Sequence, residues 1–482
     1  MYLIVCFVVM LFTDNLKYDL VGIIISILVV IVAYFKWSFG YWKRRGLETP
    51  TPSMPFGNTS DFFFLKQSFG EVWGNIYFKL KSKGLRHGGG YFTLSPMYIP
   101  IDLEIIKNIL QRDFHHFEGH GLYSNENADP ISANLFNIDG HKWRTTRVKL
   151  TPTFTSGKMK MMIQTLIECS NGLKELLDKL SNQNTPIDIK DVLARFTTDV
   201  IGSCAFGIDC NSMKDPDSEF LNETIAYREK NNIDRKDFMH LLIQLKNKGK
   251  LYKDEEINEK KEVDMTTGKL TINDIVAQSS IFFIAGFETS STTMNFATYE
   301  LAINPNIQDI LREEINTVLK KYDDKLTYDA IMEMTYLDKL ICETLRKYPP
   351  FPLLVRICTK DYQVPGTDVV IEKGTNVIFP LLGIHHDPEY YPNPQKFDPE
   401  RFNEENKDKR PSFTWLPFGE GPRICIGLRF AMLQSKIGLI TLLKHYKITL
   451  NNKTELPIAF KKFGVVSAPE SEIWIDVHKI HN

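Results

Sequence analysis

The longest uninterrupted run of apolar residues in the chain lies near its N-terminus, from Leu20 to Phe35. Its sixteen residues fall short of the ~20 that span a bilayer, but the aromatic residues that follow and a snorkelling Lys36 extend the usable length toward Trp42. The basic cluster Lys43-Arg44-Arg45 comes directly afterwards. The pattern predicts a membrane anchor, and the positive-inside rule places the bulk of the chain on the cytosolic side.

A shorter apolar run occupies residues 2–12 and is separated from the first by the mainly polar residues 13–19. Its eleven residues are too few to span a membrane. We expect residues 1–46 to form an N-terminal hydrophobic extension and anchor, and residues 47–482 to form one further domain. A cleaved signal peptide is the alternative, but no small-residue cleavage pattern follows the apolar stretch, and the basic residues lie on its wrong side.

Beyond the anchor, the pattern of polar and apolar positions changes several times. Residues 48–57 hold three prolines within six positions, which predicts an extended, semi-rigid spacer between membrane and globule. The alternating segment 90–100 predicts short strands, and the mixture of Gly, His and polar residues at 114–137 predicts a long loop. A helical pattern follows Gly140, and a long helix is predicted from Thr271 to Asn304.

Composition narrows the class of protein. The 482 residues are 43% hydrophobic and 12% aromatic, and no linker or internal repeat divides them, so one large domain with a sizeable core is expected. The 58 basic and 59 acidic residues balance, which excludes a global pull toward nucleic acid or acidic substrates. Seven scattered cysteines, an odd number, indicate a reducing compartment.

The segment Phe418-Gly-Glu-Gly-Pro-Arg-Ile-Cys-Ile-Gly427 carries the most specific chemical signal in the chain. It is a loop rich in glycine that leads into an apolar helical pattern, so it presents the Cys425 thiol at the start of a helix. The free N–H groups and the positive end of a helix favour the thiolate, which is the form that ligates metal. A buried free cysteine is the common alternative for any single cysteine.

The spacing of this segment decides between the two interpretations. Phe418, the glycines at 419, 421 and 427, and Arg423 stand around Cys425 as in the haem-binding signature of the cytochrome P450 family, which the chain therefore resembles. The resemblance implies a mainly α fold with a small β-rich region, and a haem-thiolate monooxygenase whose cofactor is haem b (iron protoporphyrin IX). It makes Cys425 the axial iron ligand, whose thiolate pushes electron density toward O–O cleavage.

Further motifs are similar to those of cytochromes P450 and follow in the family's order. Trp143 and Arg147 match the W-x-x-x-R pattern that supplies an indole N–H and a guanidinium to the haem propionates. Outside the resemblance, an aromatic side chain capped by a cation on a helix surface is the ordinary interpretation. Arg356 and Arg423 stand where relatives use an arginine on a propionate. The segment that begins at Lys149 resembles the insect family-six microsomal members in particular.

Within the predicted long helix, Ala285-Gly286-Phe-Glu288-Thr289 resembles the family motif A-G-x-[DE]-T. The resemblance implies that Ala285 and Gly286 leave room for O₂ above the haem. It also implies that Thr289 hydrogen-bonds the oxygen and that Glu288 joins a water-linked proton relay, which makes these two the candidate catalytic residues. Without the family motif, Ser and Thr side chains that hydrogen-bond their own helix are an equally good interpretation.

Two short charged segments resemble the family's E-x-x-R and P-E-R-F set. They supply Glu343 and Arg346, and then Arg401 within Pro399-Glu-Arg-Phe402. On its own, an acid and a base three residues apart indicate only a weak surface pair. The resemblance implies that Glu343, Arg346 and Arg401 lock the fold beneath the haem, which is a structural role.

Electrons must come from a partner, because the sequence contains no phosphate-cradling glycine-rich fingerprint of a nicotinamide or flavin site. The resemblance implies an NADPH-dependent cytochrome P450 reductase, with cytochrome b5 as a second candidate partner. Basic residues near the haem, such as Lys142, Arg144 and Lys149, are candidates for the docking surface. The resemblance also implies the cytosolic face of the endoplasmic reticulum membrane and lipophilic substrates, either xenobiotics or endogenous lipids.

The main departure from the family lies around residues 207–270, where relatives place several roof helices over the substrate pocket. Here the chain passes from Glu219 almost directly to Tyr227, so the roof is predicted to be shortened. One alternative to an active enzyme is therefore a haem-binding protein that turns over poorly and leaks reduced oxygen as peroxide. A second alternative is a haem-thiolate isomerase or dehydratase of the same fold, against which Glu288 and Thr289 argue.

Overall fold

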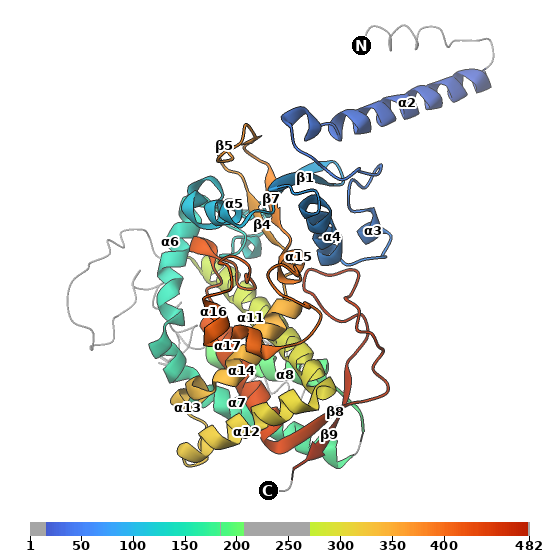
Figure 1. The fold of residues 1–482 in the computed structure, drawn as a ribbon. Coiled ribbons are helices and arrows are strands. Elements are labelled where there is room, and N and C mark those ends of the chain that lie inside the picture. The colour runs from blue at the N-terminus through green and yellow to red at the C-terminus, as the bar shows by residue number, and fades with distance from the viewer. Residues whose placement is uncertain (1–15, 184, 207–269, 481–482) are drawn as a thin grey trace.

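The computed structural model describes residues 16–183, 185–206 and 270–480. Figure 1 shows a mainly helical body with small sheets at two places and one long helix that leaves the body near the N-terminus. The helices are α2 (Leu16–Ser38), α3 (Ser60–Phe63), α4 (Phe69–Lys81), α5 (Leu103–Lys107), α6 (Gly140–Leu150), α7 (Ser156–Asn182), α8 (Ile189–Ile201), α11 (Ile272–Ile303), α12 (Pro305–Lys321), α13 (Tyr328–Glu333), α14 (Thr335–Lys347), α15 (Leu381–His385), α16 (Glu404–Lys407) and α17 (Leu428–His445). The strands are β1 (His87–Phe92), β2 (Ser95–Pro100), β3 (Ile187–Asp188), β4 (Leu354–Ile357), β5 (Tyr362–Gln363), β6 (Val370–Ile371), β7 (Asn376–Phe379), β8 (Tyr446–Leu450) and β9 (Trp474–Lys479). The predicted mainly α fold with a small β-rich region is confirmed.

The largest sheet described has the strand order β1-β2-β7-β4. β1 and β2 form an antiparallel hairpin, β2 pairs in parallel with β7, and β7 pairs antiparallel with β4. In the last pair Arg356 stands opposite Val377, and this register sets the position of the arginine along β4. The strands β3-β9-β8 form a second sheet at the other end of the body, and β5-β6 form a short ribbon.

Helix α11 runs through the middle of the helical part (Figure 1). The Thr271 hydroxyl accepts from the Asp274 N–H at 3.1 Å, and the Asp274 carboxylate accepts from the Thr271 N–H at 2.9 Å, so a capping box begins the helix. Every residue from Ser290 to Leu301 is buried, because α8, α14 and α17 pack around this half of α11. The helix predicted from Thr271 to Asn304 is confirmed.

Two groups of buried hydrophobic side chains hold the body together. The first joins α7, α8, α11, α12, α14 and α17, and the second joins α4, β1, β2, β7 and α15. Leu416 belongs to the second group, whereas Phe418 packs against the first. The segment that leads to Cys425 therefore passes between the two cores.

Helix α2 is longer than the apolar pattern predicted. Its 23 residues, at about 1.5 Å per residue, reach roughly 35 Å, which is enough to cross the ~30 Å hydrocarbon core of a bilayer. Most of its apolar side chains are exposed, and the helix points away from the body (Figure 1). By length and composition it is a candidate membrane span.

The prediction that Trp42 extends this apolar stretch is wrong. Trp42 is fully buried in the globular body, and its indole N–H donates to the Gly90 carbonyl at 2.9 Å. Its backbone N–H donates to the Tyr91 hydroxyl at 3.2 Å. Aromatic residues look alike in a sequence whether they face lipid or a protein core, since both surroundings are apolar.

The prediction of an extended, semi-rigid spacer at residues 48–57 is wrong as well. Ser53 and Gly57 exchange two backbone hydrogen bonds of 2.7 Å, which folds the segment into a turn. Directly after it, the Asn58 N–H donates to the Tyr91 carbonyl of β1 at 2.9 Å. The stiff proline backbone is used in a packed turn against the sheet.

Other local predictions are confirmed. The segment 90–100 forms parts of β1 and β2, and residues 114–137 form a loop with short 3₁₀ turns. The helix expected after Gly140 is α6. The predicted shortening at 207–270 lies outside the described residues, apart from the last residue of that range.

Candidate functional site

The loop before α17 places Cys425. A 3₁₀ turn, η8 (Gly421–Arg423), precedes it, and the Cys425 N–H donates to the Phe418 carbonyl at 2.8 Å, which closes the loop. Gly421 has a φ of +73°, and a Cβ at this position would lie 1.9 Å from the Leu110 carbonyl oxygen. Only glycine fits such a backbone at such a distance from a neighbour.

The Cys425 side chain is exposed yet strongly desolvated. Burial raises the pKa of its thiol, while the Gly427 N–H and the Arg147 guanidinium oppose that rise. An exposed thiol that is nevertheless desolvated lines an internal space rather than the outer surface. The helix-start N–H predicted to favour a thiolate is present at Gly427, but burial outweighs its effect on the pKa.

Helix α6 brings Trp143 and Arg147 to the same site. Trp143 is 3% exposed, with the Phe114 ring 5.6 Å away and the Arg423 guanidinium 4.3 Å from the centre of the indole. Burial lowers the pKa of Arg147, and the charge of a Cys425 thiolate opposes this change. The guanidinium and the thiol are therefore close enough to interact.

Arg356 of β4 is a buried guanidinium with too few partners. It is 1% exposed, and its Nη1 donates to the adjacent Val355 carbonyl at 2.9 Å. Its Nε makes no hydrogen bond to any residue that the structure describes. Burial, with a contribution from Arg423, lowers its pKa to about 9. A buried charge with an unsatisfied donor is costly unless an anion completes its coordination.

Arg423, in contrast, has a full set of protein partners. It donates to the carbonyls of Glu118 at 2.8 Å and Ile138 at 2.7 Å, and to the Asp139 carboxylate at 2.9 Å. Burial lowers its pKa to about 10, and Asp139 opposes that change. Arg423 ties the long loop to the Cys425 loop, so it offers the site positive charge more than free donors.

His120 is a residue of this site that the sequence did not reveal. Its Nδ1 lies 2.7 Å from the Phe136 carbonyl oxygen. Burial, together with the charges of Arg356 and Arg423, lowers its pKa to about 3, so the imidazole is neutral. The only signal in the sequence was a run of His and Gly in the predicted loop, and nothing there indicated the arginines as partners.

The residues around Cys425 fit a haem. Arg147, Arg356 and Arg423 are three guanidinium groups whose pKa values burial lowers, so the site has an excess of poorly hydrated positive charge. The two carboxylates of a porphyrin would supply negative charge and the acceptor that the Arg356 Nε lacks. The inward-facing Cys425 sulfur is of the type that holds haem iron in thiolate-ligated enzymes.

A separate part of the predicted site is the Ala285–Thr289 turn in the middle of α11. Ala285 is exposed although it lies in a long packed helix. Gly286 lies against α8, where a Cβ would come 2.6 Å from the Ile201 Cδ1. The Thr289 hydroxyl donates to the Ala285 carbonyl at 2.6 Å, so it bonds its own helix, and its oxygen keeps lone pairs to accept a further hydrogen bond.

Glu288, the predicted acid of this turn, has a lysine partner. The Lys190 Nζ of α8 lies 3.1 Å from the Glu288 carboxylate and also donates to the hydroxyls of Ser291 at 2.7 Å and Thr292 at 2.9 Å. Burial lowers the pKa of Lys190, and Glu288 opposes this change. The partly buried acid therefore has a charge partner, which the sequence could not indicate because that lysine lies 98 residues away.

The comparison with known proteins agrees with this arrangement. The family model for Cytochrome P450 matches residues 63–243 and 219–475. The chain belongs to the cytochrome P450 family. The segment around Cys425 lies within the second match, and both matches together cover most of the chain.

Relatives of this cytochrome P450 come from insects. It is 40% identical to "Probable cytochrome P450 6a20" of Drosophila melanogaster over 515 aligned positions, which cover 95% of this chain and 100% of the relative. It is 39% identical to "Cytochrome P450 6A1" of Musca domestica, covering 95% and 97%, and 39% identical to "Cytochrome P450 6k1" of Blattella germanica, covering 94% and 96%. The predicted resemblance to insect family-six members is confirmed, and the protein is a haem-dependent cytochrome P450 monooxygenase.

The family's E-x-x-R and P-E-R-F segments meet in one buried network in this cytochrome P450. The Glu343 carboxylate accepts from Arg346 at 2.7 and 2.8 Å, and both side chains are fully buried. Arg346 also donates to the carbonyls of His385 at 3.0 Å and Pro394 at 2.8 Å. The Arg401 Nε lies 3.4 Å from the same carboxylate. The three residues predicted to lock the fold are thus brought together.

The basic residues suggested for reductase docking are not a free basic patch. Lys142 pairs with Glu126, and Arg144 pairs with Glu118. Lys149 is 6% exposed, and burial lowers its pKa. Two of the three charges thus have an acidic partner within the protein and the third is buried. Their part in docking an acidic partner stays a prediction.

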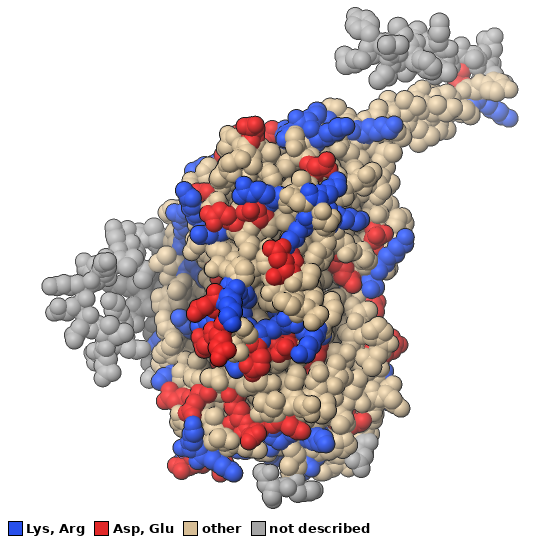
Figure 2. All heavy atoms as spheres, viewed as in Figure 1, with Lys and Arg blue, Asp and Glu red and all other residues tan. Residues whose placement is uncertain are grey.

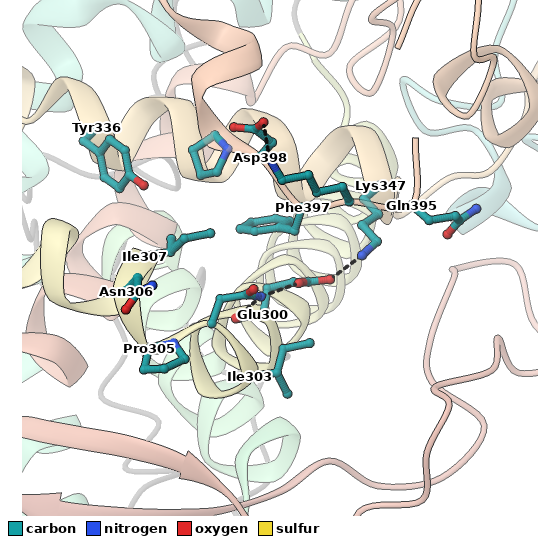
Figure 3. Close-up of a pocket in the computed structure, with 13 residues that line it drawn as sticks. Glu300, Ile303, Pro305, Asn306, Ile307, Tyr336, Lys347, Gln395, Phe397 and Asp398 are labelled. Atoms are coloured by element: carbon teal, nitrogen blue, oxygen red, sulfur yellow. Dashed lines mark hydrogen bonds and ion pairs between the residues drawn. The ribbon is translucent and has the colours of Figure 1, made fainter. Parts of the chain in front are cut away.

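A cavity of about 600 Å³ lies at the C-terminal end of α11, away from the Ala285–Thr289 turn (Figure 3). Glu300 on its wall bonds Lys347 at 2.8 Å, and the Lys396 ammonium lies 3.2 Å from Asp398. Its charged groups are therefore paired within the protein. None of the predicted haem-binding or catalytic residues lines it.

Proposed function

We propose that this cytochrome P450 inserts one atom of O₂ into lipophilic small molecules, xenobiotics or endogenous lipids, with electrons from NADPH delivered by a reductase. The observation that carries the proposal is the inward-facing Cys425 thiol beside the half-buried Arg147 and two buried guanidiniums, one of which, Arg356, has an unsatisfied Nε. This donor set matches a thiolate-ligated haem b better than any simple anion, because it combines a soft metal ligand with carboxylate-binding forks.

In this proposal the chain's own residues have distinct roles. Cys425 holds the iron, and Arg147, Arg356 and Trp143 hold the porphyrin carboxylates, while Arg423 fixes the loop that brings them together. When bound, the haem supplies the oxidising chemistry by activating dioxygen. Phe418, at the start of the Cys425 loop, packs against the first core and forms part of the proposed cradle.

The Ala285–Thr289 turn forms the oxygen-side wall of the pocket. Ala285 and Gly286 present almost no side-chain volume, so a small molecule can lie against the helix. Thr289 accepts or relays a hydrogen bond, and Glu288 supplies the proton. The Lys190 ammonium, 3.1 Å from the Glu288 carboxylate, gives this acid a charge partner on the side of α8.

The predicted shortening of the roof favours a second candidate, a haem-binding isoform that turns over poorly. The family model matches in two segments that overlap at residues 219–243, within the predicted shortening. The 515 positions aligned with the Drosophila relative also exceed the 482 residues of this chain, so the relative has residues without a counterpart here. A pocket with an incomplete roof admits water, and reduced oxygen is then lost as peroxide.

Membrane attachment is supported by three features. α2 is long and apolar enough to span, and basic side chains gather where it joins the body (Figure 2). Phe64 and Leu65, about 60% exposed, continue the apolar surface onto the globular domain near α3. We therefore propose the cytosolic face of the endoplasmic reticulum membrane, with a cytochrome P450 reductase and cytochrome b5 as partners there.

Two measurements test the proposal. The reduced, carbon monoxide-treated protein is expected to show the Soret band of a thiolate-ligated haem, and a band at the position of an imidazole or neutral-thiol ligand would refute it. Purified protein with reductase and an alkoxycoumarin probe then separates the two candidates. Hydroxycoumarin formed in proportion to NADPH consumed supports the monooxygenase, whereas NADPH recovered mainly as peroxide supports the poorly coupled isoform.

A further inference from the structure

The Ala285–Thr289 turn is held by side chains in a way that the rest of α11 is not. Backbone carbonyls inside a helix normally accept only the N–H four residues later. In this turn the carbonyls of residues 285 to 289, five in succession, each also accept a hydrogen bond from a side chain. Thr289, Ser291 and Thr293 of α11 itself donate three of these bonds. The bonds to Gly286 and Phe287 come from Gln434 and Thr197 on other helices.

Gln434 provides the bond to Gly286. It lies on α17, nine residues after Cys425, and its Nε2 donates to the Gly286 carbonyl at 3.0 Å. Gln434 is fully buried, and its Oε1 makes no hydrogen bond to the residues that the structure describes. Burying a side-chain amide costs free energy unless its hydrogen bonds are made. The bond to the Gly286 carbonyl offsets part of that cost for Gln434.

Thr197 provides the bond to Phe287. It lies on α8, is fully buried, and its hydroxyl donates to the Phe287 carbonyl at 3.0 Å as well as to the Ala194 carbonyl of its own helix at 3.1 Å. Two neighbouring carbonyls of the turn are thus bonded by two different helices. Because both donor side chains are fully buried, they fix the turn from two directions.

The packing around the turn leaves it little room to shift. On the α8 side, a Cβ at Gly286 would lie 2.6 Å from Ile201, and on the α17 side a Cβ at Gly438 would lie 2.4 Å from the Met294 sulfur. A glycine within a helix weakens the helix locally because it has more backbone freedom to lose. The bonds from Gln434 and Thr197 oppose this weakness where the oxygen-side wall needs a fixed position.

We propose that Gln434 and Thr197 are positioning residues that fix the Ala285–Thr289 turn through its carbonyls. Gln434 connects the helix that follows the iron ligand directly to the wall on the oxygen side, so the two sides of the haem site move as one unit. The inference rests on the proposed role of Glu288 and Thr289 at that wall.

Amide hydrogen exchange on the haem-loaded, full-length protein tests the positioning role. The variants are Gln434→Met and Thr197→Val, which remove the donor at nearly constant volume. The matched control is Thr298→Val, because the buried Thr298 hydroxyl donates to the Met294 carbonyl at 2.8 Å within the same helix. Amides of residues 285–290 are expected to exchange about fivefold faster in the first two variants, as the loss of one buried hydrogen bond implies.

In Thr298→Val the amides of 285–290 keep the wild-type rate. Thr197→Ser retains the hydroxyl and is expected to show wild-type exchange. It is the control that distinguishes loss of the hydrogen bond from a general folding defect in Thr197→Val. Unchanged exchange in both Gln434→Met and Thr197→Val, or an equal change in Thr298→Val, would overturn the proposal.

The infrared stretching band of carbon monoxide bound to the reduced protein gives a second readout at the oxygen side. Thr289→Val serves as the reference and is expected to move the band, and Gln434→Met and Thr197→Val are expected to move or split it while Thr298→Val does not. A band that Thr289→Val leaves in place shows that the turn does not face the ligand, and the proposed function of the turn then fails. The positioning role of Gln434 and Thr197 is in that case decided by the hydrogen-exchange measurement alone. A band moved by Thr289→Val but not by either positioning variant contradicts the inference alone.

Discussion

The Lys190 ammonium lies 3.1 Å from the Glu288 carboxylate and connects α8 to the acid of the Ala285–Thr289 turn. Both side chains are partly buried, and the same ammonium bonds the hydroxyls of Ser291 and Thr292. The ammonium therefore holds the Glu288 carboxylate close to the two hydroxyls.

Replacing Lys190 by Met is expected to lower turnover about five- to tenfold while the carbon monoxide spectrum stays of the thiolate type, since it removes the ammonium that holds the Glu288 carboxylate and the hydroxyls of Ser291 and Thr292 in place. Lys190→Arg should retain most activity. Product formed per NADPH is the measurement. Lys347→Met is the matched control, because Lys347 bonds Glu300 at 2.8 Å on the far end of the same helix. Equal loss in both methionine variants would show a merely structural effect.

Removing the Arg356 guanidinium is expected to weaken haem binding about tenfold or more, because a charge-assisted bond to a carboxylate is worth roughly 1.5–3 kcal/mol. The variant Arg356→Met tests this by the rate of haem transfer to apomyoglobin. Arg356→Lys keeps the charge without the planar fork, so its rate of haem transfer should lie between those of the wild type and Arg356→Met. Wild-type retention in Arg356→Met would mean that the unsatisfied Nε does not face the cofactor.

Replacing Glu343 by Gln is expected to cost about 3–5 kcal/mol of unfolding free energy, because it leaves the fully buried Arg346 without its counter-charge. The midpoint of thermal unfolding is the measurement. Glu372→Gln is the control, since Glu372 pairs with Arg45 at a partly exposed site where a pair is worth less than about 1 kcal/mol. Similar midpoints for the two variants would contradict the structural role.

Gly421→Ala is expected to prevent haem incorporation. Its Cβ would overlap the Leu110 carbonyl, and its φ of +73° disfavours any side chain. Gly427→Ala, in the same loop, should incorporate haem normally, because no described atom lies within 4 Å of its Cβ and its backbone N–H is kept. The haem-to-protein absorbance ratio of both variants distinguishes local strain from general sensitivity of the loop.

Stability is expected to fall as the pH drops below about 6.5. Burial and the Arg346 charge lower the pKa of His386 to about 3, whereas an unfolded histidine titrates near 6.5. Between these values the unfolded chain binds a proton that the folded chain does not, so stability is complete above the unfolded pKa and is lost toward acid. The loss is about 1.4 kcal/mol per pH unit for this residue. His386→Gln should show a shallower decline of the unfolding midpoint from pH 7 to 5.5, and an unchanged slope would contradict the assignment.

The sequence predicted those parts of the site whose residues lie close together along the chain. The Cys425 loop, the Ala285–Thr289 turn and the Glu343–Arg346 pair are local motifs, so their resemblance to the family's motifs identified them. His120, Lys190 and Gln434 were missed, because each acquires its role from a partner that is distant in sequence. Trp42 was misassigned because apolar and aromatic residues suit a bilayer and a protein core equally well.

The short connection between α2 and the body has a consequence for how the enzyme sits at a membrane. α2 ends at Ser38, and Trp42 is already locked in the core by its bond to Gly90. Three residues therefore separate the candidate span from the core of the globular domain, which is too few to form a flexible linker. A tilt of the helix in the bilayer would therefore rotate the whole catalytic domain. Because bilayer thickness influences the tilt of a spanning helix, it would also influence how the catalytic domain is oriented toward the lipid surface.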